Sequence, residues 1–462
     1  MSDDLVVWYN TPAEHWYDAL PVGNGRLGAM VYGEQRVERI TLDESTFWSG
    51  EASPEADCQG NPTRLAEIRQ RLADGELATA HTLAEEITGR KGNYGTNLRM
   101  GNLWLVLDHP LEGMSGYRRS LDLEQAVAQV SYVWHGAEYR RQVFASHPDQ
   151  TLVVRLTCSQ PGALGLRLWL DGDEQPFSAR SEGDDTLLMD CLARETTHSD
   201  GQTGVDGHVR LRVQTEGGTL SSYGCQIRVA DATAVTVLVA IGTTWDGADP
   251  VTACQARIAA AGAQPYEALL AAHVADYRQL YLRSGLDLGP APHPDWPIDR
   301  RLAAVRAGED DPHLCALVYQ FGRYLLIASS RHDSPLPAHL LGVWNDNVAA
   351  RIGWTCDYHL DINTQMNYWI AELTGLSECH LPLFRWIQER LVPSGRHTAR
   401  LLHGLPGWVA YIVSNAGASA RPAGAPIGAS SRPAVSGSPC TSGITTPSPA
   451  IAFSWPSRLI RC

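Results

Sequence analysis

Short runs of alternating apolar and polar residues restrict the fold of this chain more than any other feature. Six such runs occupy residues 126–133, 138–145, 151–157, 164–170, 208–215 and 234–241. Successive side chains of a β-strand point to opposite faces, so this period of two predicts strands with one buried face. Clusters of Gly, Asp, Pro and Ser separate the runs at a spacing typical of an all-β sandwich. We therefore predict a β-sandwich over residues 1–250, with one helical interruption at 64–86.

The apolar period changes to that of a helix after residue 250. Residues 253–285 have a helical pattern, and a Pro-rich run at 290–296 predicts an extended hinge. Two further helices are predicted within 298–331, and the second is apolar around much of its surface, as in a buried helix. The chain thus divides into a sandwich (1–250), a helical linker (251–290) and a helical domain (291–410). The fold class is multidomain β + α.

Composition excludes several classes of partner. The 462 residues include 51 Asp and Glu but only 37 Lys and Arg, a formal net charge of −14. An acidic surface repels phosphate, which argues against nucleic acid and anionic membranes as partners. The N-terminus has no basic segment followed by an apolar run, so we expect no signal peptide, no membrane span and a cytoplasmic location. Ten cysteines without a CxxC pair are expected to be buried thiols.

Residues 342–384 are unusually rich in aromatic, amide and carboxylate side chains, which can bind a ligand or take part in catalysis. Trp344, Trp354 and Trp369 offer flat apolar faces, and Asn345 lies among other amides and carboxylates. This combination suits a ligand with apolar C–H faces and many hydroxyl groups, which means a sugar. A packing role in the core is the alternative for each Trp, because large aromatic side chains are usually buried.

Three polar residues alternate within this stretch. His359, Asp361 and Asn363 precede a helical pattern that begins at residue 364. On an extended segment this spacing points all three side chains in one direction, toward a common ligand. Asp357, His359 and Asp361 also have the donor types of a metal site, which is the less favoured interpretation.

Three motifs resemble the catalytic-domain signature of glycoside hydrolase family 95: in order along the chain, they are WND, HLDINTQMNYW and LSECHLPLF. Its members are inverting α-L-fucosidases and some L-galactosidases. LPVGNGRLGAM, LDESTFWSG, YRRSLDLEQAVAQVSY and YRRQVFASHPDQ resemble the N-terminal domain of the same family. The resemblance covers residues 8 to about 410. It implies a large β-sandwich, or super-sandwich, beside an (α/α)6 barrel, of which this chain would hold a part.

The resemblance also implies roles for the alternating residues. Asp361 and Asn363 match two amides that hold the hydrolytic water, and His359 matches a sugar contact that tends to be His in fucosidases. Asp361 departs from the amide pattern, and a carboxylate can itself accept the proton of a water. The family uses no catalytic metal, and we expect no cofactor or metal here. The expected substrate is a fucosylated oligosaccharide or glycoconjugate. An α-L-galactosidase, a glycoside phosphorylase and a non-catalytic carbohydrate-binding protein are the alternatives.

Residues 411–462 differ from the rest in composition. More than half are Ala, Ser, Pro or Gly, none is Asp, Glu or Lys, and no apolar period is present. Such a segment is predicted to be disordered, as an out-of-frame or truncated gene product would be. The Glu that acts as general acid in the family has no counterpart here, so we expect this chain to be inactive. Glu372 and Glu378 are the nearest alternative acids, although surface positions on helices are the simpler interpretation.

Overall fold

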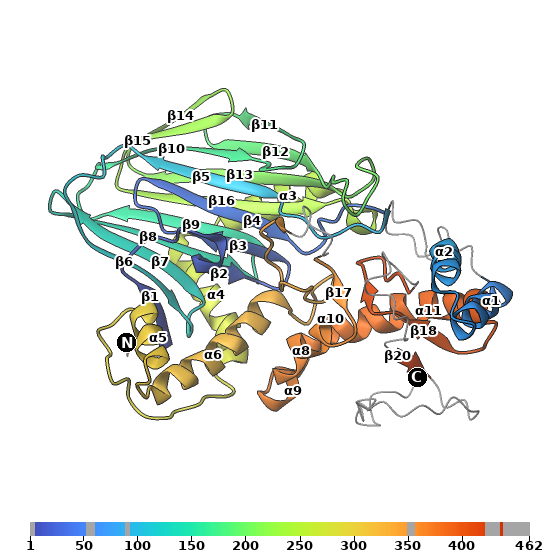
Figure 1. The fold of residues 1–462 in the computed structure, drawn as a ribbon. Coiled ribbons are helices and arrows are strands. Elements are labelled where there is room, and N and C mark those ends of the chain that lie inside the picture. The colour runs from blue at the N-terminus through green and yellow to red at the C-terminus, as the bar shows by residue number, and fades with distance from the viewer. Residues whose placement is uncertain (1–4, 52–60, 88–92, 349–355, 421–434, 438–462) are drawn as a thin grey trace.

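Two antiparallel sheets form the N-terminal part of the computed structural model, which describes residues 5–51, 61–87, 93–348, 356–420 and 435–437 (Figure 1). In spatial order, the nine-stranded sheet contains β1 (Val6–Tyr9), β6 (Met114–Asp122), β7 (Val127–Trp134), β8 (Ala137–Ser146), β9 (Thr151–Cys158), β16 (Ala234–Thr243), β13 (Asp206–Glu216), β12 (Thr186–Leu192) and β11 (Phe177–Glu182). The seven-stranded sheet contains β14 (Thr219–Tyr223), β15 (Gln226–Ala232), β10 (Leu164–Asp171), β5 (Gly101–Leu107), β4 (Val37–Glu44), β3 (Leu27–Val31) and β2 (Leu20–Gly23).

The sandwich predicted from alternation is confirmed. All six predicted runs are strands, namely β7, β8, β9, β10, β13 and β16. The inward-facing side chains of both sheets share one apolar core, which includes Leu42 and Leu105 from one sheet and Val143 and Leu211 from the other. Burial of these faces removes apolar surface from water and holds the sheets together.

β16 lies inside the molecule with both of its faces covered. All ten of its residues are buried. One face belongs to the sandwich core, and the other contacts α3 (Pro250–Gly262), where Leu238 and Ala240 pack with Ile258. α4 (Tyr266–Tyr281) lies against β8. The segment predicted as a linker therefore packs on the outer face of the nine-stranded sheet.

The helical part follows this layer. It contains α5 (Ile298–Arg306), α6 (Pro312–Ser329), α8 (Asn363–Tyr368), α9 (Ile370–Leu373), α10 (Ser377–Trp386) and α11 (Val392–Thr398), with π-helical turns at Ile387–Leu391 and Ala399–His403. Two short pairings, β17 (Tyr358–His359) with β19 (Val413–Ser414) and β18 (Trp408–Ala410) with β20 (Val435–Gly437), complete it. α1 (Pro62–Ala73) and α2 (Leu77–Ile87) come from the sandwich sequence but pack beside residues 399–411 (Figure 1). A β-domain followed by a helical domain agrees with the predicted fold class.

The β2–β3 hairpin joins the two parts. Its turn contains Gly25 at φ +88°, a conformation that glycine adopts without strain. The Gly25 N–H donates to the carbonyl of Ala328 at 2.7 Å, and the Ser334 hydroxyl donates to the carbonyl of Gly25 at 2.7 Å. A Cβ at Gly25 would lie 2.6 Å from Arg331 Cγ. Glycine at this turn thus permits close contact between the sandwich and the loop after α6.

The disorder predicted from composition does not hold for residues 411–420. Tyr411, Ser414 and Asn415 are buried, and β19 pairs with β17. Small side chains pack closely at this position, with Ala416, Ala418 and Ala420 in the main apolar core. Composition alone could not predict these contacts, because they depend on partners elsewhere in the sequence, such as Tyr94 and Tyr358. Of the later residues only 435–437 are described, as a strand.

Among the described helices, none combines the length and apolar character that crossing a bilayer requires.

Candidate functional site

The alternating residues do not form one extended strip. β17 ends at His359, a turn follows at residues 361–362, and Asn363 is the first residue of α8. His359 is buried, Asp361 is exposed and Asn363 is half-buried. The main-chain N–H of Leu360 donates to the carbonyl of Ile412 at 2.6 Å, which fixes the end of the strand. The predicted common direction of the three side chains therefore fails at the turn, where the period of two ends.

His359 nevertheless lies beside the carboxylate of Asp357 and is influenced by the charge of Asp361. Its Nε2 lies 3.4 Å from Oδ1 of Asp357, which is fully buried. Burial lowers the pKa of His359, and the negative charge of Asp361 partly opposes this effect. A neutral imidazole offers one N–H donor and one acceptor, which is the pattern that a sugar hydroxyl matches.

The sandwich part supplies a second contact to this region. The Tyr94 hydroxyl donates to Oδ2 of Asp357 at 3.0 Å, and burial followed by the charge of Asp357 raises the pKa of Tyr94. Asn415 Nδ2 donates to the carbonyl of Tyr94 at 2.7 Å. Neither Tyr94 nor Asn415 was predicted, because their neighbours in sequence carry no motif. Only the tertiary structure brings residues 94, 357 and 415 together.

Two residues expected to contact sugar serve the domain junction instead. Trp344 is buried, donates from Nε1 to the carbonyl of Val22 at 2.9 Å, and packs so closely that a Cβ at Gly28 would lie 3.1 Å from its Cδ1. Asn345 is fully buried; its Nδ2 donates to the carbonyl of Asn97 at 2.7 Å. Protein atoms occupy the faces and donors of both side chains, which favours the packing alternative for each.

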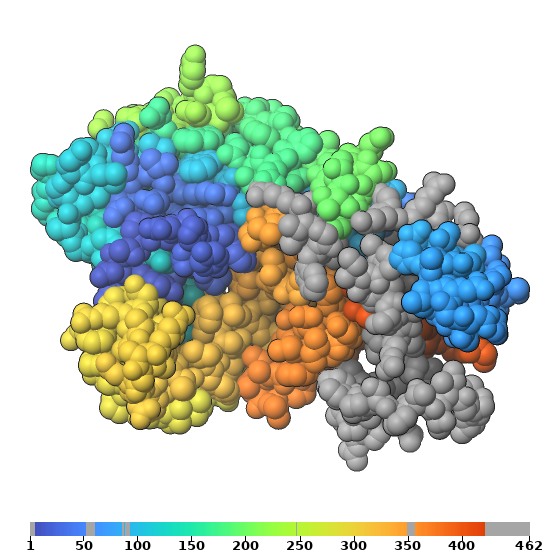
Figure 2. Space-filling model, viewed as in Figure 1, coloured from blue at the N-terminus to red at the C-terminus, as the bar shows by residue number. Residues whose placement is uncertain are grey.

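Trp369 has the opposite environment. Its side chain is 47% exposed, between α8 and α9, so its indole face is accessible to a ligand. Met366 and Leu373 are exposed on the same helical segment, and Figure 2 shows this orange segment at the molecular surface. Trp354 lies outside the described residues.

Both alternative acids are engaged in ion pairs. Oε1 and Oε2 of Glu378 each lie 2.8 Å from Nη1 of Arg283. Burial raises the pKa of Glu378, but the hydrogen bond and charge of Arg283, together with a backbone hydrogen bond and the charge of His332, lower the net pKa. Glu372 Oε1 lies 3.0 Å from Nδ1 of His380. A general acid must hold its proton near working pH, so the environment of Glu378 is unsuitable for that role.

A surface hollow of about 260 Å³ lies on the sandwich, away from the predicted site residues. Its lining includes Asp108, His109, Trp134 and Arg228. None of the residues predicted to bind sugar contributes to this hollow.

Comparison with known families supports both domains. Residues 7–248 match the family described as glycosyl hydrolase family 65, N-terminal domain, and residues 265–436 match the glycosyl hydrolase family 95 catalytic domain. The second match extends past residue 410, where the resemblance was expected to end. This extension agrees with the packed state of residues 411–420.

Curated proteins that are similar to this chain are named as fucosidases. The chain is 32% identical over 451 residues to "Alpha-L-fucosidase 2" of Arabidopsis thaliana, covering 91% of this chain and 53% of that protein. It is 28% identical over 423 residues to "Probable alpha-fucosidase A" of Aspergillus oryzae, covering 86% of this chain and 57% of that protein. The chain therefore spans somewhat more than half the length of the curated relatives that it matches.

A solved structure shares the fold at low identity. "Putative kojibiose phosphorylase from human microbiome" aligns with a TM-score of 0.57 and 8% identity, over 92% of this chain and 53% of that chain. Identity this low indicates a common architecture alone and does not favour the phosphorylase alternative.

Proposed function

Because the chain belongs to glycoside hydrolase family 95, we propose that it is of the inverting α-L-fucosidase type and takes fucosylated oligosaccharides or glycoconjugates. The observation that carries this proposal is His359, buried beside Asp357 and facing the charge of Asp361. In this proposal His359 contacts a hydroxyl of L-fucose, and Asp361 with Asn363 positions the attacking water. Trp369 supplies an apolar face for the ring.

Inversion requires the water to attack the face of the sugar opposite the leaving group. One carboxyl group then protonates the leaving oxygen, and a second group activates the water, with roughly 6.5–9.5 Å between two such carboxyl groups. Asp361 is exposed and can accept a proton from a water. Asp361 is therefore proposed as the base, in place of the amide that the family pattern has at this position.

The helical domain is proposed to be part of an (α/α)6 barrel. α5 is connected to α6, and α8 to α10 and α11, by short segments. The likeness to a solved structure of related architecture is consistent with this proposal. A barrel positions loops at one end of paired helices, which suits the placement of residues 357–363.

We expect this 462-residue chain to bind L-fucose with little or no turnover. Glu378 is paired with Arg283, and Glu372 contacts the ring of His380. This favours carbohydrate binding as the second candidate function for the chain in this form.

Calorimetry with L-fucose and an L-fucose-like iminosugar tests the proposal. His359→Ala is expected to weaken binding about tenfold, the value of roughly one hydrogen bond. His81→Ala, on the exposed surface of α2, is the matched control. Equal affinity of wild type and His359→Ala would refute the proposed sugar contact.

Hydrolysis of aryl α-L-fucoside and aryl α-L-galactoside tests reaction and specificity. Turnover with the β-anomer as first product would establish inversion and overturn the expected inactivity. In that case Asp361→Asn should lower kcat at least a hundredfold, because the proposed base is removed. A preference for the galactoside would instead support the α-L-galactosidase alternative.

A further inference from the structure

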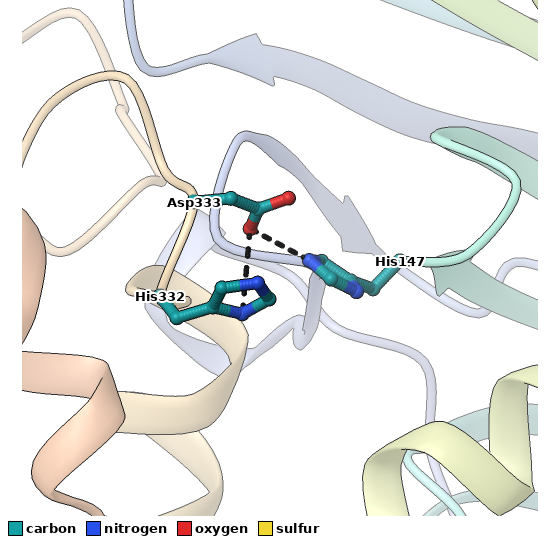
Figure 3. Close-up of side chains that lie close together, drawn as sticks. All are labelled: His147, His332 and Asp333. Carbon is teal, nitrogen blue, oxygen red and sulfur yellow. Dashed lines mark hydrogen bonds and ion pairs between the residues drawn. The ribbon is translucent and has the colours of Figure 1, made fainter.

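We propose that His147, His332 and Asp333 form a binding site for a divalent transition-metal ion of the Zn²⁺ type at the junction of the two domains. Figure 3 shows the three side chains converging from two separate loops. Their ligand atoms all lie within 4.8 Å of one another. The proposal does not depend on the glycosidase function, and its failure would leave that function untouched.

The fold brings the three ligands together from distant parts of the sequence. His147 directly follows β8 in the sandwich, whereas His332 and Asp333 lie in the loop after α6. The same junction contains the contact between Gly25 and Ser334. Asp333 and His332 have side chains that are 53% and 58% exposed, so an ion from solvent can reach them. An ion held here would connect the two domains directly.

The donor set selects the kind of ion. Two imidazole nitrogens and one carboxylate oxygen are ligands that Zn²⁺ and its neighbours in the transition series prefer, whereas Ca²⁺ and Mg²⁺ prefer oxygen alone. In a tetrahedral zinc site, ligand atoms about 2.0–2.1 Å from the metal lie roughly 3.4 Å from each other. Water would fill the fourth position.

The distances between the ligand atoms in this structure are close to those of a tetrahedral zinc site. His147 Nε2 lies 2.8 Å from Oδ1 of Asp333, and His332 Nδ1 lies 3.9 Å from the same oxygen. Rotation of the exposed His332 side chain is therefore the main adjustment that binding requires. Such a rotation costs little, because protein atoms do not enclose this ring.

A fourth residue orients His147 in the way that metal sites commonly do. His147 Nδ1 lies 3.5 Å from Oδ1 of Asp276, a residue of α4. Arg331 holds that carboxylate in turn, with Nη1 at 2.9 Å from Oδ2. A carboxylate that accepts the Nδ1 proton leaves Nε2 free to bind an ion and increases its basicity. This arrangement points Nε2 of His147 at Asp333.

The local charge also favours a cation. Asp276 and Asp333 carry two negative charges, and Arg331 neutralises one of them. One negative charge therefore faces the two imidazole rings, which a divalent ion would offset. The competing explanation is a proton on His147, which would pair with both carboxylates and hold the junction by ion pairing alone.

Calorimetric titration of the untagged, chelator-treated full chain with ZnCl₂ separates these explanations. One equivalent of Zn²⁺ is expected to bind, with no comparable binding of Ca²⁺. His332→Ala and Asp333→Asn should each weaken binding at least tenfold, and Asp276→Asn should weaken it 10–100-fold through the orientation of His147. His81→Ala, which removes an exposed histidine from α2, should leave the affinity unchanged.

Substitution with Co²⁺ provides a readout of geometry, because a tetrahedral site absorbs visible light more strongly than hexaaqua Co²⁺. The absorbance should appear in wild type and disappear in His332→Ala. His332 is exposed, so its loss removes no buried packing, and circular dichroism checks the fold of every variant. Absence of one-equivalent zinc binding would overturn the proposal in favour of the protonated ion-pair network. Equal zinc affinity in wild type, His332→Ala and Asp333→Asn would overturn it too, since the ion would then bind elsewhere.

Discussion

The sandwich buries its apolar faces, whereas part of the helical domain leaves apolar side chains exposed. In the sandwich, both sheets bury their inner faces, and α3 covers the outer face of β16. In the helical domain, Met366, Trp369 and Leu373 recur at helical spacing along α8 and α9 and remain exposed. Leu373 is 88% exposed, whereas Leu211 in β13 is completely buried. The sandwich is therefore a closed core, while the α8–α9 segment keeps an open apolar face.

The two kinds of apolar surface therefore contribute to different properties, namely stability and binding. A closed core determines how much free energy is needed to unfold the chain, and an open apolar face is available for contact with other molecules. The two domains meet through buried polar contacts around residues 97–99 and 345–347. Substitutions at the junction, in the core and on the open face should therefore have effects of decreasing size on stability.

The largest loss of stability is expected at the junction. Arg99 is buried, donates from Nε to the carbonyl of Asn345 at 3.0 Å, and pairs with Asp173 at 2.8 Å. Arg99→Ala would remove the donor to the buried carbonyl of Asn345 and the cation that pairs with Asp173, which typically costs about 3–5 kcal/mol. Urea unfolding followed by tryptophan fluorescence measures this change. Arg140→Ala, which breaks an exposed pair with Glu138, should cost less than about 1 kcal/mol. Equal effects would contradict the contrast between the junction and the surface.

The sandwich core comes next. Leu211→Ala should lower the free energy of unfolding by about 2–5 kcal/mol, because it removes packed methyl groups and leaves a cavity. Leu373→Ala should change it by less than about 0.5 kcal/mol, since this side chain contacts mostly solvent. Thermal unfolding of both variants under one condition provides the comparison. A large effect of Leu373→Ala would mean that the α8–α9 face is covered in solution.

A buried carboxyl group at the domain junction should make the stability of the chain depend on pH. Burial raises the pKa of Asp43, at the junction end of β4, to about 8, and the charge of Arg99 only partly opposes this. Between the unfolded pKa near 4 and pH 8, the unfolded chain loses a proton that the folded chain keeps. Stability should therefore fall as pH rises through this range, by at most about 1.4 kcal/mol per pH unit.

Asp43→Asn removes that titration while preserving the shape of the side chain. The variant should gain stability relative to wild type as pH increases from 5 to 8, as measured by the urea midpoint at each pH. Asp295→Asn makes the same substitution at an exposed position and is the matched control. A constant difference for Asp43→Asn would rule out the raised pKa.

The smallest effect on stability is expected on the open face. Leu373→Lys should leave the unfolding midpoint unchanged and reduce self-association in sedimentation velocity, because a charge interrupts the apolar face. Leu77→Lys, at an exposed position in α2, should not affect association to the same extent. Identical sedimentation of wild type and Leu373→Lys would indicate that this face does not drive association.

The sequence alone determined the elements whose pattern is local. The period of two located β7 to β10, β13 and β16, and the words around residues 359–369 identified the family. These features are readable because each residue's neighbours in sequence determine which face it presents. The same local reasoning predicted an extended strip through Asp361, which the turn at 361–362 interrupts.

Only the tertiary structure decided which polar residues meet. It buried Trp344 against Val22, joined Tyr94 and Asn415 to the region of Asp357, and packed residues 411–420 that composition had predicted to be disordered. It also brought His147 to Asp333 across the domain junction. Such contacts connect residues that are tens to hundreds of positions apart. These contacts form only when whole domains pack against each other, and the pattern of neighbouring residues does not determine that packing.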